Sequence, residues 1–225
     1  MEYQNKISLQ WDNVYNRFRG KRLSVWRETA TPFFVNKIEY LKYKKVKNIL
    51  DAGCGDGRNL SAFAQEGFDV MGFDVSSLAI KKCKKIFDNY SNVHLQQGLL
   101  EEIDYYFKPS NFDVIICDFV LAHIKQTKKV IDCFYGLVKK KGYILLEFTS
   151  VYDPHCGQGK QIGKNSFIQH NMFLKFYTLK DIEKMLKKFT ILIIDSYYYT
   201  DPAHGKGYHR KKRHTHHSYF VLAQK

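Results

Sequence analysis

The stretch Asn48-Ile49-Leu50-Asp51-Ala52-Gly53-Cys54-Gly55-Asp56-Gly57-Arg58-Asn59-Leu60 organises the rest of the chain. The apolar run that opens it, at 46–50, favours a strand because it is too short for a helix. The run 58–65 that closes it has the apolar spacing of a helix. Three glycines at alternate positions lie between the two. Glycine permits a sharp strand-to-helix turn and lets a ligand approach the backbone closely, and a helix start offers that ligand unpaired N–H groups.

A second acid, Asp74, stands at the end of the apolar run 69–74. Its distance from the glycines is that of a carboxylate that binds ribose hydroxyls in a βαβ nucleotide site. The spacing behind Asp51, Gly-x-Gly-x-Gly, differs from the Gly-x-Gly-x-x-Gly of dinucleotide enzymes. Loop and acid together resemble the first two motifs of class I S-adenosylmethionine (SAM)-dependent methyltransferases of the small-molecule, TehB-like type. The structural alternative is a tight turn followed by a helix-capping Asp. It explains neither the glycine loop nor the position of Asp74 well.

The resemblance covers 46–148 well and the flanking segments more loosely. It implies an α/β fold: one three-layer, doubly wound, Rossmann-like domain over 1–225, with a seven-stranded, mostly parallel sheet and an antiparallel strand pair at the C-terminal end. The expected strands are 46–50, 69–74, 93–98, 112–118, 143–148, 190–199 and 218–223. The lysine run 139–141 and Gly142 are expected to close the helix before the fifth strand, because cations and glycine are typical of a helix C-terminus.

The composition is that of one globular domain. The chain has 225 residues, of which 44% are hydrophobic and 16% aromatic, enough for a full core. Apolar runs stay far below the about 18 residues that span a membrane, and the first residues lack the apolar region of a signal peptide. Five widely spaced cysteines without Cys-x-x-Cys indicate neither a disulfide framework nor a zinc knuckle. The cytoplasm is the expected location, with no membrane partner.

The formal net charge of +14 is the one unusual feature of the composition. A basic surface can collect phosphates, so RNA has to be considered as a partner. The lysines are, however, spread over several expected helices, which favours charges that are simply solvated. A small-molecule substrate is therefore the favoured partner and RNA the less favoured one.

Aromatic residues mark the segment 1–30, which precedes the first expected strand. Trp11, Tyr15 and Phe18 share one helical face by their spacing. One interpretation is that this face packs on the core. The other is a lid, because in the methyltransferases that the chain resembles an N-terminal segment closes over SAM and substrate. Tyr15 and Trp26 then cover cofactor or substrate, with Trp26 assigned to the substrate, since an aromatic ring face attracts a sulfonium cation.

The resemblance implies a role for each part of the SAM site. The glycines shape the loop against the methionine part, Asp51 orients that loop or meets the amino group, and Asp74 binds the ribose. The family usually places an adenine-contacting Asp where this chain has Leu99, so Glu101, Glu102 or backbone groups near Leu99 have to substitute. The expected cofactor residues are Asp51, Gly53, Cys54, Gly55, Gly57, Asn59, Asp74, Val75, Leu99, Leu100, Asp118 and Phe119.

The fourth expected strand, 112–118, resembles the motif IV strand of the family, whose end faces the transferred methyl group. In a doubly wound sheet, ligands sit outside the carboxyl ends of the strands, which places Asp118, Phe119 and His123 at the reaction site. Transfer from a sulfonium mainly needs alignment of nucleophile and methyl, and a base only if the acceptor is protonated. His123 is the first candidate for that base, because imidazole titrates near neutrality; the alternative is a histidine that packs in the fold. Tyr15 and His216 are weaker catalytic candidates.

Two long segments, 149–177 and 200–217, have the composition of loops on the substrate side. The first leaves the carboxyl end of a strand and is expected to build the substrate pocket. The second holds five of the nine histidines, of which His204 and His214 are expected to bind substrate. The alternatives are a solvated loop without a site role, a phosphate- or RNA-binding loop, and a metal site with His214 and His216 on one strand face. No metal is expected, because no cluster of acids or cysteines accompanies these histidines.

The most specific conclusion is SAM-dependent methyl transfer to a small polar or anionic acceptor. The fourth strand lacks the Asp/Asn-Pro-Pro-Tyr signature of enzymes that methylate exocyclic base amines, which argues against that reaction. An RNA or protein methyltransferase that uses the basic surface is the first alternative. A SAM-binding interaction protein without turnover is the second. The oligomeric state has no signal in the sequence.

Overall fold

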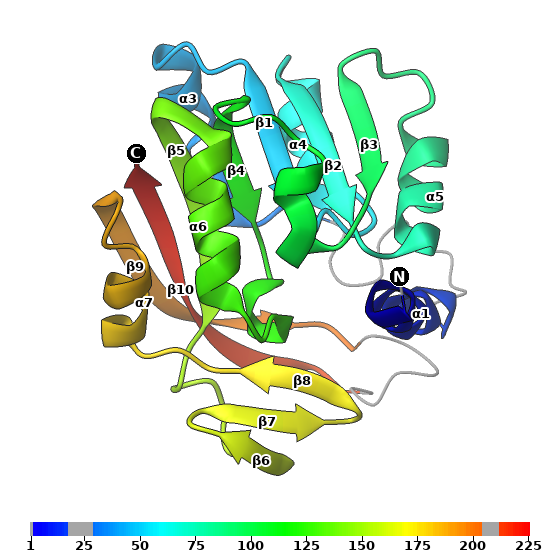
Figure 1. Ribbon diagram of the computed structural model, residues 1–225, viewed down its shortest axis with the longest axis vertical. Coiled ribbons are helices and arrows are strands. Elements are labelled where there is room, and N and C mark those ends of the chain that lie inside the picture. Colours follow the sequence, from blue (N-terminus) through cyan, green and yellow to red (C-terminus); the bar gives the residue numbers. More distant parts are fainter. Residues whose placement is uncertain (1, 18–28, 204–211) are drawn as a thin grey trace.

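The computed structural model describes residues 2–17, 29–203 and 212–225. Its centre is a seven-stranded sheet in the order β3-β2-β1-β4-β5-β10-β9 (Figure 1). The strands are β1 (Asn48–Ala52), β2 (Asp69–Asp74), β3 (Val93–Gln97), β4 (Phe112–Cys117), β5 (Val138–Thr149), β9 (Thr190–Asp201) and β10 (His214–Gln224). A separate three-stranded sheet consists of β6 (Lys160–Gly163), β7 (Ser166–Gln169) and β8 (Met172–Lys175) and lies below the large one in Figure 1.

The directions of the strands confirm the expected fold class. β1 pairs in parallel with β2 and β4, β2 with β3, and β4 with β5. β10 enters between β5 and β9 and runs antiparallel to both. The central strands are apolar runs covered on both faces, as parallel strands require, and Leu50, Ile115 and Ile116 are fully buried.

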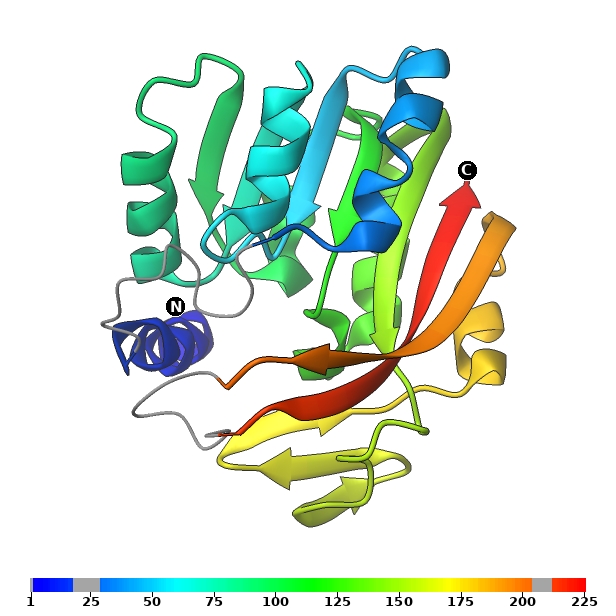
Figure 2. The ribbon, with the colours of Figure 1, turned by 180° about the vertical axis from the view of Figure 1, so that it is seen from behind.

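Helices cover both faces of the large sheet and make it the middle of three layers (Figures 1 and 2). One face carries α6 (Thr127–Leu137), α7 (Leu179–Met185) and the 3-10 segment η1 (Leu100–Tyr105). The other face carries α2 (Pro32–Val35), α3 (Ile38–Tyr43), α4 (Arg58–Gln65) and α5 (Ser77–Ile86). Helix α1 (Glu2–Arg17) stands apart from both groups. Each face has its own apolar core. Phe134 and Ile182 are fully buried in the first, and Phe34 and Phe63 in the second.

Helix α1 lies at the end of the sheet where the parallel strands terminate (Figure 1). Its Asp12 carboxylate accepts hydrogen bonds from Ser76 Oγ (2.6 Å) and Ser77 Oγ (2.8 Å) at the start of α5. On its other side, Gln10 Nε2 donates to the carbonyl oxygen of Asn171 (3.0 Å), between β7 and β8. The helix therefore connects α5 to the small sheet across the carboxyl ends of the strands.

Three expectations about local structure are wrong. The segment 200–217 is not a loop at its two ends, because β9 extends to Asp201 and β10 begins at His214. The lysine run 139–141 does not close a helix, because α6 ends at Leu137 and the lysines follow Val138, the first residue of β5. Lys139 Nζ pairs with Asp113 Oδ1 at 2.8 Å. The segment 149–177 is not simply a loop, because three of its short runs pair into the sheet β6–β8. Strands of four residues each are too short for a periodic pattern to stand out.

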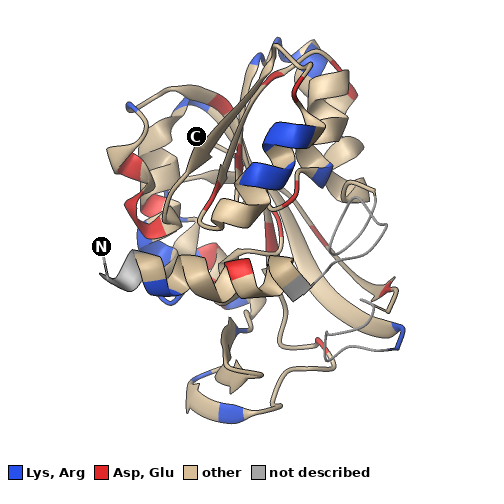
Figure 3. Ribbon diagram, turned by 90° about the vertical axis from the view of Figure 1, so that its right-hand side faces the viewer, with Lys and Arg blue, Asp and Glu red and all other residues tan. Residues whose placement is uncertain are grey.

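Positive charge is distributed over many elements. Figure 3 shows Lys and Arg from the top of the large sheet down to the small sheet, with Asp and Glu between them. This distribution fits solvated charges better than one basic face. Within the described parts of the chain, no helix combines the length and the apolar character that crossing a membrane would take.

Candidate active site

A cavity of about 410 Å³ opens at the carboxyl ends of the parallel strands. Its walls come from the glycine loop after β1, the turns after β2, β3 and β4, helix α1, the small sheet, and the ends of β9 and β10. This edge is where doubly wound sheets bind their ligands. The volume falls in the range of about 300–1,000 Å³ that small-molecule pockets occupy.

The glycine loop has a backbone that favours glycine. Gly53, Gly55 and Gly57 have φ angles of +84°, +56° and +90°, in the left-handed region. A Cβ on Gly53 would lie 2.2 Å from Val120 Cγ2, and one on Gly55 would lie 2.6 Å from Tyr15 Oη. The loop therefore passes close to both neighbours without room for side chains, and it leads into α4 as the sequence predicts.

Asp74 fixes this loop to the next turn. Its Oδ2 accepts the Gly55 N–H (2.9 Å) and its Oδ1 accepts the Ser76 N–H (2.8 Å). Burial raises the pKa of this carboxyl to about 6. Cys54 is buried in the same loop, and its hydrogen bond with Cys83 and its burial raise the pKa of its thiol. Cys54 is therefore a neutral thiol that fills space under the loop.

Beyond Asp74, the cavity wall is apolar except for one acid. Val75, Leu99 and Leu100 line the cavity, and both leucines are buried. Glu101 lines it too, and its buried Oε2 has no hydrogen-bond partner among the described residues. Burial raises the pKa of the Glu101 carboxyl. A buried acceptor of this kind beside an apolar wall suits a flat ligand that offers a hydrogen-bond donor.

Asp51 lies in β1, behind the cavity wall that begins at Gly53. Its side chain is buried, and within the described chain neither carboxylate oxygen has a hydrogen-bond partner. Burial and then the nearby charge of Asp118 raise the pKa of Asp51 to about 8. The described residues show no hydrogen bond by which this carboxylate would orient the loop, so its role stays a prediction.

Asp118, just after β4, joins three parts of the chain. Its Oδ2 accepts Thr31 Oγ1 at 2.7 Å and Asn59 Nδ2 at 3.0 Å, and it pairs with Arg58 Nη2 at 2.5 Å. Its Oδ1 is buried and lacks a hydrogen-bond partner in the described structure, while the residue lines the cavity. Asp118 therefore ties α4 and the start of α2 to the cavity wall and presents a further acceptor.

His123 lies at the cavity on the 3-10 segment η2 (Leu121–His123). Its Nδ1 is 3.1 Å from the carbonyl oxygen of Phe173 in β8. Because a carbonyl only accepts, Nδ1 donates, and the neutral ring carries its lone pair on Nε2. Trp11 packs edge-on against this ring with the centroids 4.8 Å apart, and Tyr15 contacts the glycine loop. Trp11 and Tyr15 of α1 therefore line the cavity, whereas Phe18 lies outside the described residues. Tyr15 is also buried, so the lid and the packing interpretation both stay open.

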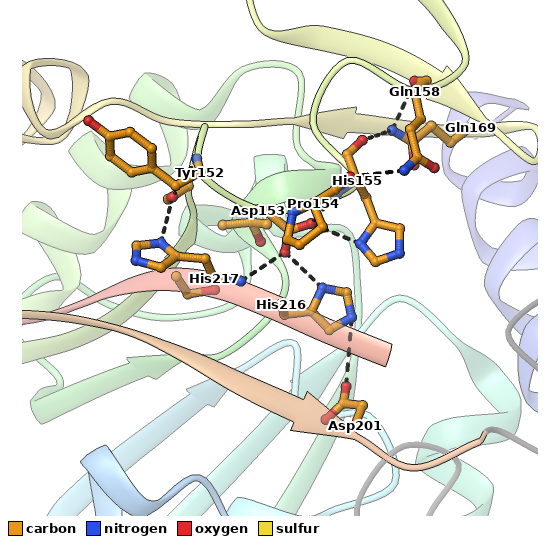
Figure 4. Close-up of polar contacts among 12 residues, drawn as sticks. Tyr152, Asp153, Pro154, His155, Gln158, Gln169, Asp201, His216 and His217 are labelled. Atoms are coloured by element: carbon orange, nitrogen blue, oxygen red, sulfur yellow. Dashed lines mark hydrogen bonds and ion pairs between the residues drawn. The ribbon is translucent and has the colours of Figure 1, made fainter. Parts of the chain in front are cut away.

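Histidines and acids form the far end of the cavity (Figure 4). At its centre, Asp153 Oδ1 accepts His155 Nδ1 (2.9 Å) and Oδ2 accepts His216 Nδ1 (2.8 Å). Burial alone would raise the pKa of Asp153, but these hydrogen bonds hold it well below its usual range. His216 Nε2 lies 3.9 Å from Asp201 Oδ2, and the His214 ring centroid lies 4.9 Å from that of His216.

The structure brings most of the expected site residues to this one cavity. Its lining includes Tyr15, Gly53, Cys54, Gly55, Asn59, Asp74, Val75, Leu99, Leu100, Asp118, Phe119, His123 and His216. Asp51 and Gly57 lie behind the wall, and His214 packs beside His216. Trp26 and His204 lie outside the described residues. The roles assigned to all of these residues stay predictions.

Residues 15–190 match the model of a known family, described as a methyltransferase domain. The chain belongs to this methyltransferase family. The match covers well over half of the chain and includes the glycine loop, Asp74, Asp118 and His123. The family expected from the loop and the acid is therefore confirmed.

Individual methyltransferases show how far the likeness extends. The ubiquinone biosynthesis O-methyltransferase of Pseudomonas fluorescens is 32% identical over 118 residues, which are 50% of this chain and 49% of that enzyme. The chain thus spans about half the length of this relative. TehB of Haemophilus influenzae has a TM-score of 0.66 and 17% identity, covering 88% of this chain and 63% of that one.

A second solved structure is similar over almost the whole chain. The 1,6-didemethyltoxoflavin-N1-methyltransferase of Burkholderia thailandensis has a TM-score of 0.67 at 17% identity and covers 99% of this chain and 89% of that one. It was solved with 1,6-didemethyltoxoflavin and S-adenosylhomocysteine bound. At this identity the likeness shows the shared fold.

Three acidic and imidazole residues of the methyltransferase cavity were not expected from the sequence. Asp153 stands 63 residues before His216, and His155 follows it, so no local spacing connects this pair to the histidine-rich segment. Asp201 is different, because it lies directly opposite His214 in the β9–β10 register, and pairing the two strands in sequence would have found it. The premise that no acids accompany these histidines is therefore wrong.

Proposed function

We propose that this methyltransferase domain transfers the methyl group of SAM to a small polar or anionic acceptor. The single cavity that reaches from the glycine loop to the cluster of Asp153 and His216 carries this proposal. Donor and acceptor would share one space, and alignment within it is most of what transfer from a sulfonium requires. Helix α1 and the small sheet bound that space, which favours a small acceptor over RNA or protein.

The residues of the loop end fit SAM. The glycine loop leaves backbone open to the methionine part, and Asp74 stands where a ribose would offer its hydroxyls. Val75 and Leu99 form the wall for an adenine ring, and Glu101 replaces the family's usual Asp as acceptor for the adenine amine. SAM supplies an electrophilic methyl group when it is bound. Asp118 Oδ1 remains as an acceptor for polar hydrogens near the centre of the cavity.

His123 is the residue to which we assign removal of a proton from the acceptor. Its contact with the Phe173 carbonyl holds the tautomer whose Nε2 accepts protons. Tyr15 and His216, the weaker candidates, serve instead as positioning groups at the donor end and the acceptor end. The names of the Pseudomonas and Burkholderia methyltransferases, which refer to ubiquinone biosynthesis and to 1,6-didemethyltoxoflavin, support an acceptor of small size.

Methyl-labelled SAM added to cell extract tests the proposal. After incubation with the protein, the extract is separated into metabolites, RNA and protein. Label in the metabolites supports the proposal, and mass spectrometry then identifies the acceptor. Label confined to RNA or protein contradicts it and moves recognition to the basic surface. SAM binding without label in any fraction contradicts catalysis and favours the non-catalytic alternative.

The role of His123 has its own test. We expect His123→Ala to lower turnover about 100-fold or more, the usual contribution of a general base, with little change in affinity for S-adenosylhomocysteine. His94→Ala is the matched control, because His94 is exposed on β3, away from the cavity. Unchanged turnover in His123→Ala would return this histidine to a packing role.

A further inference from the structure

His214, His216 and Asp201 meet on one face of the β9–β10 pair. In the register of the two strands, His214 lies opposite Asp201 and His216 lies opposite Tyr199. Residues two apart in a strand point to the same face, so two imidazoles and one carboxylate converge. One nitrogen or oxygen from each of the three residues lies within 4.8 Å of the others.

The spacing between His216 and Asp201 permits a shared ion and excludes a direct hydrogen bond. His216 Nε2 and Asp201 Oδ2 are 3.9 Å apart, which is too long for a hydrogen bond. Two atoms that each bind a metal at about 2.1 Å are at most about 4.2 Å apart, so this pair lies within that limit. The rings of His214 and His216 are nearly perpendicular, at 83°, with their centroids 4.9 Å apart.

Outer contacts fix the tautomer of both histidines. His216 Nδ1 lies 2.8 Å from Asp153 Oδ2, and His214 Nδ1 lies 3.1 Å from the carbonyl oxygen of Lys212. Both oxygens are acceptors, so each Nδ1 donates and each neutral ring carries its lone pair on Nε2. Metal-binding histidines almost always donate their other ring N–H to a carboxylate or a carbonyl in this way. The two histidines are therefore oriented as ligands by contacts that need no ion.

We propose that Asp201, His214 and His216 bind one divalent transition-metal ion of the Zn²⁺ class at the far end of the cavity. Two imidazoles and one carboxylate are the protein ligands of metal sites that keep a coordination position open. Asp201 and His216 line the cavity, so the open position faces it. That position takes an anionic or lone-pair group of the methyl acceptor, and this last step rests on the proposed function.

A neighbouring trio, Asp153, His155 and His216, also has ligand-like spacing. Its contacts are direct hydrogen bonds, at 2.9 Å from His155 Nδ1 and 2.8 Å from His216 Nδ1 to the Asp153 carboxylate. An ion between these atoms would have to displace both protons. We therefore place the ion at Asp201 and treat Asp153 as the positioning residue that holds His216.

Titration of the full chain with Co²⁺ and competition by Zn²⁺ test the site. The protein is first dialysed against a chelator, and Co²⁺ binding is followed by its visible absorption and by calorimetry. We expect one ion per chain, and loss of this binding in Asp201→Ala and in His214→Ala. Asp153→Asn is expected to keep the stoichiometry and to weaken affinity about 10- to 100-fold, as loss of an outer partner does. The control His94→Ala is expected to bind as the unaltered chain.

Three results would overturn the metal site. The first is no Co²⁺ binding by the unaltered chain. The second is binding that is unchanged in both Asp201→Ala and His214→Ala, which would place the ion elsewhere. The third is binding that survives in those variants but is lost in His155→Ala, which would assign the ion to the Asp153 trio. Circular dichroism of every variant confirms that the chain is folded before its titration is interpreted.

Titration with S-adenosylhomocysteine separates this inference from the proposed function. All metal-site variants are expected to bind S-adenosylhomocysteine normally, because Asp201 and His214 stand at the other end of the cavity. Once the methyl acceptor has been identified, removal of the metal by a chelator should abolish methyl transfer, and added Zn²⁺ should restore it. Cofactor binding without metal binding would refute the metal site alone, and metal binding without cofactor binding would refute the proposed function alone.

Discussion

At the scale of single residues, Gly55 decides whether a cofactor fits. We expect Gly55→Ala to lose binding of S-adenosylhomocysteine, because the new Cβ would stand 2.6 Å from Tyr15 Oη in the cavity wall. Gly67 is the matched control, since its φ is also positive, at +84°, but nothing lies within 4 Å of its Cβ position. Backbone strain should cost each variant about 1 kcal/mol of stability, the contact with Tyr15 should add to that cost in Gly55→Ala, and only Gly55→Ala should affect the ligand. Calorimetry and chemical denaturation measure the two effects; equal affinities in the two variants would contradict the assignment.

Glu101 and Glu102 form a second residue-scale test. Glu101 lines the cavity with a buried acceptor atom, whereas Glu102 is absent from its lining. If Glu101 accepts a hydrogen bond from adenine, Glu101→Ala should weaken S-adenosylhomocysteine binding roughly 10-fold or more, and Glu102→Ala should leave it unchanged. Comparing S-adenosylhomocysteine with its purine analogue that lacks the amine sharpens the result, because Glu101→Ala should remove the preference between them. A preference that persists would place the adenine contact elsewhere.

The two ends of the cavity differed in how well single residues could be predicted. The residues of the cofactor end follow short strands that succeed one another in the chain, so Gly55, Asp74 and Leu99 could be placed from local spacing. The acceptor end depends on contacts between distant segments. Asp153 reaches His216 only after the chain has built the small sheet and α7 between them, and no pattern within either segment indicates that contact.

At the scale of elements, the β5–β10 pair contains a buried acid that should shape the dependence of stability on pH. Glu147 of β5 is fully buried and accepts Ser218 Oγ at 2.5 Å. Burial raises the pKa of Glu147 from 4.5 to about 8, so between these values the folded chain holds a proton that the unfolded chain releases. The free energy of unfolding therefore falls as pH rises through this window, by roughly 1.4 kcal/mol per pH unit for each such group. Asp51 acts in the same direction.

Glu147→Gln should make this pH dependence less steep. The amide keeps the shape of the side chain but cannot ionise, so only the contribution of Asp51 and smaller ones remain between about pH 4.5 and 8. Chemical denaturation at several pH values in that window measures the slope for the unaltered chain, for Glu147→Gln and for the exposed control Glu183→Gln. Equal slopes in all three proteins would show that Glu147 does not hold its proton.

Sequence patterns found the elements of the large sheet because each carries its own signal. The helix at 58–65 and the strand at 69–74 agree with α4 and β2 to the residue. The lysine run 139–141 misled because a charged helix end and a charged strand start have the same composition. In the structure the lysines lie in a register shift between Val138 and Tyr143, which both pair with β4, and Lys139 pairs with Asp113. The small sheet β6–β8 was missed because its strands have no internal sequence pattern. Only the pairing between them makes them a sheet.

At the scale of the whole molecule, α1 bridges α5 and the small sheet along one side of the cavity. Asp12 accepts hydrogen bonds from Ser76 and Ser77 beside the cofactor end, Gln10 reaches Asn171, and Trp11 packs on His123. A ligand that contacts the loop under Tyr15 should therefore hold α1 in place. Hydrogen exchange of the α1 amides should slow when S-adenosylhomocysteine binds.

Asp12→Ala should uncouple α1 from the loop. Removing the carboxylate breaks the hydrogen bonds to the start of α5, so α1 amides should exchange faster in the free protein and gain less protection from S-adenosylhomocysteine. We expect its affinity to fall roughly 10-fold, the effect of losing about one hydrogen bond to a charged group, while the fold of the sheet is unaffected. Asp88→Ala, an exposed acid beyond the far end of α5, should change neither quantity. Protection of α1 that is identical with and without ligand would show that the helix is a fixed wall of the cavity, and that donor and acceptor enter without its movement.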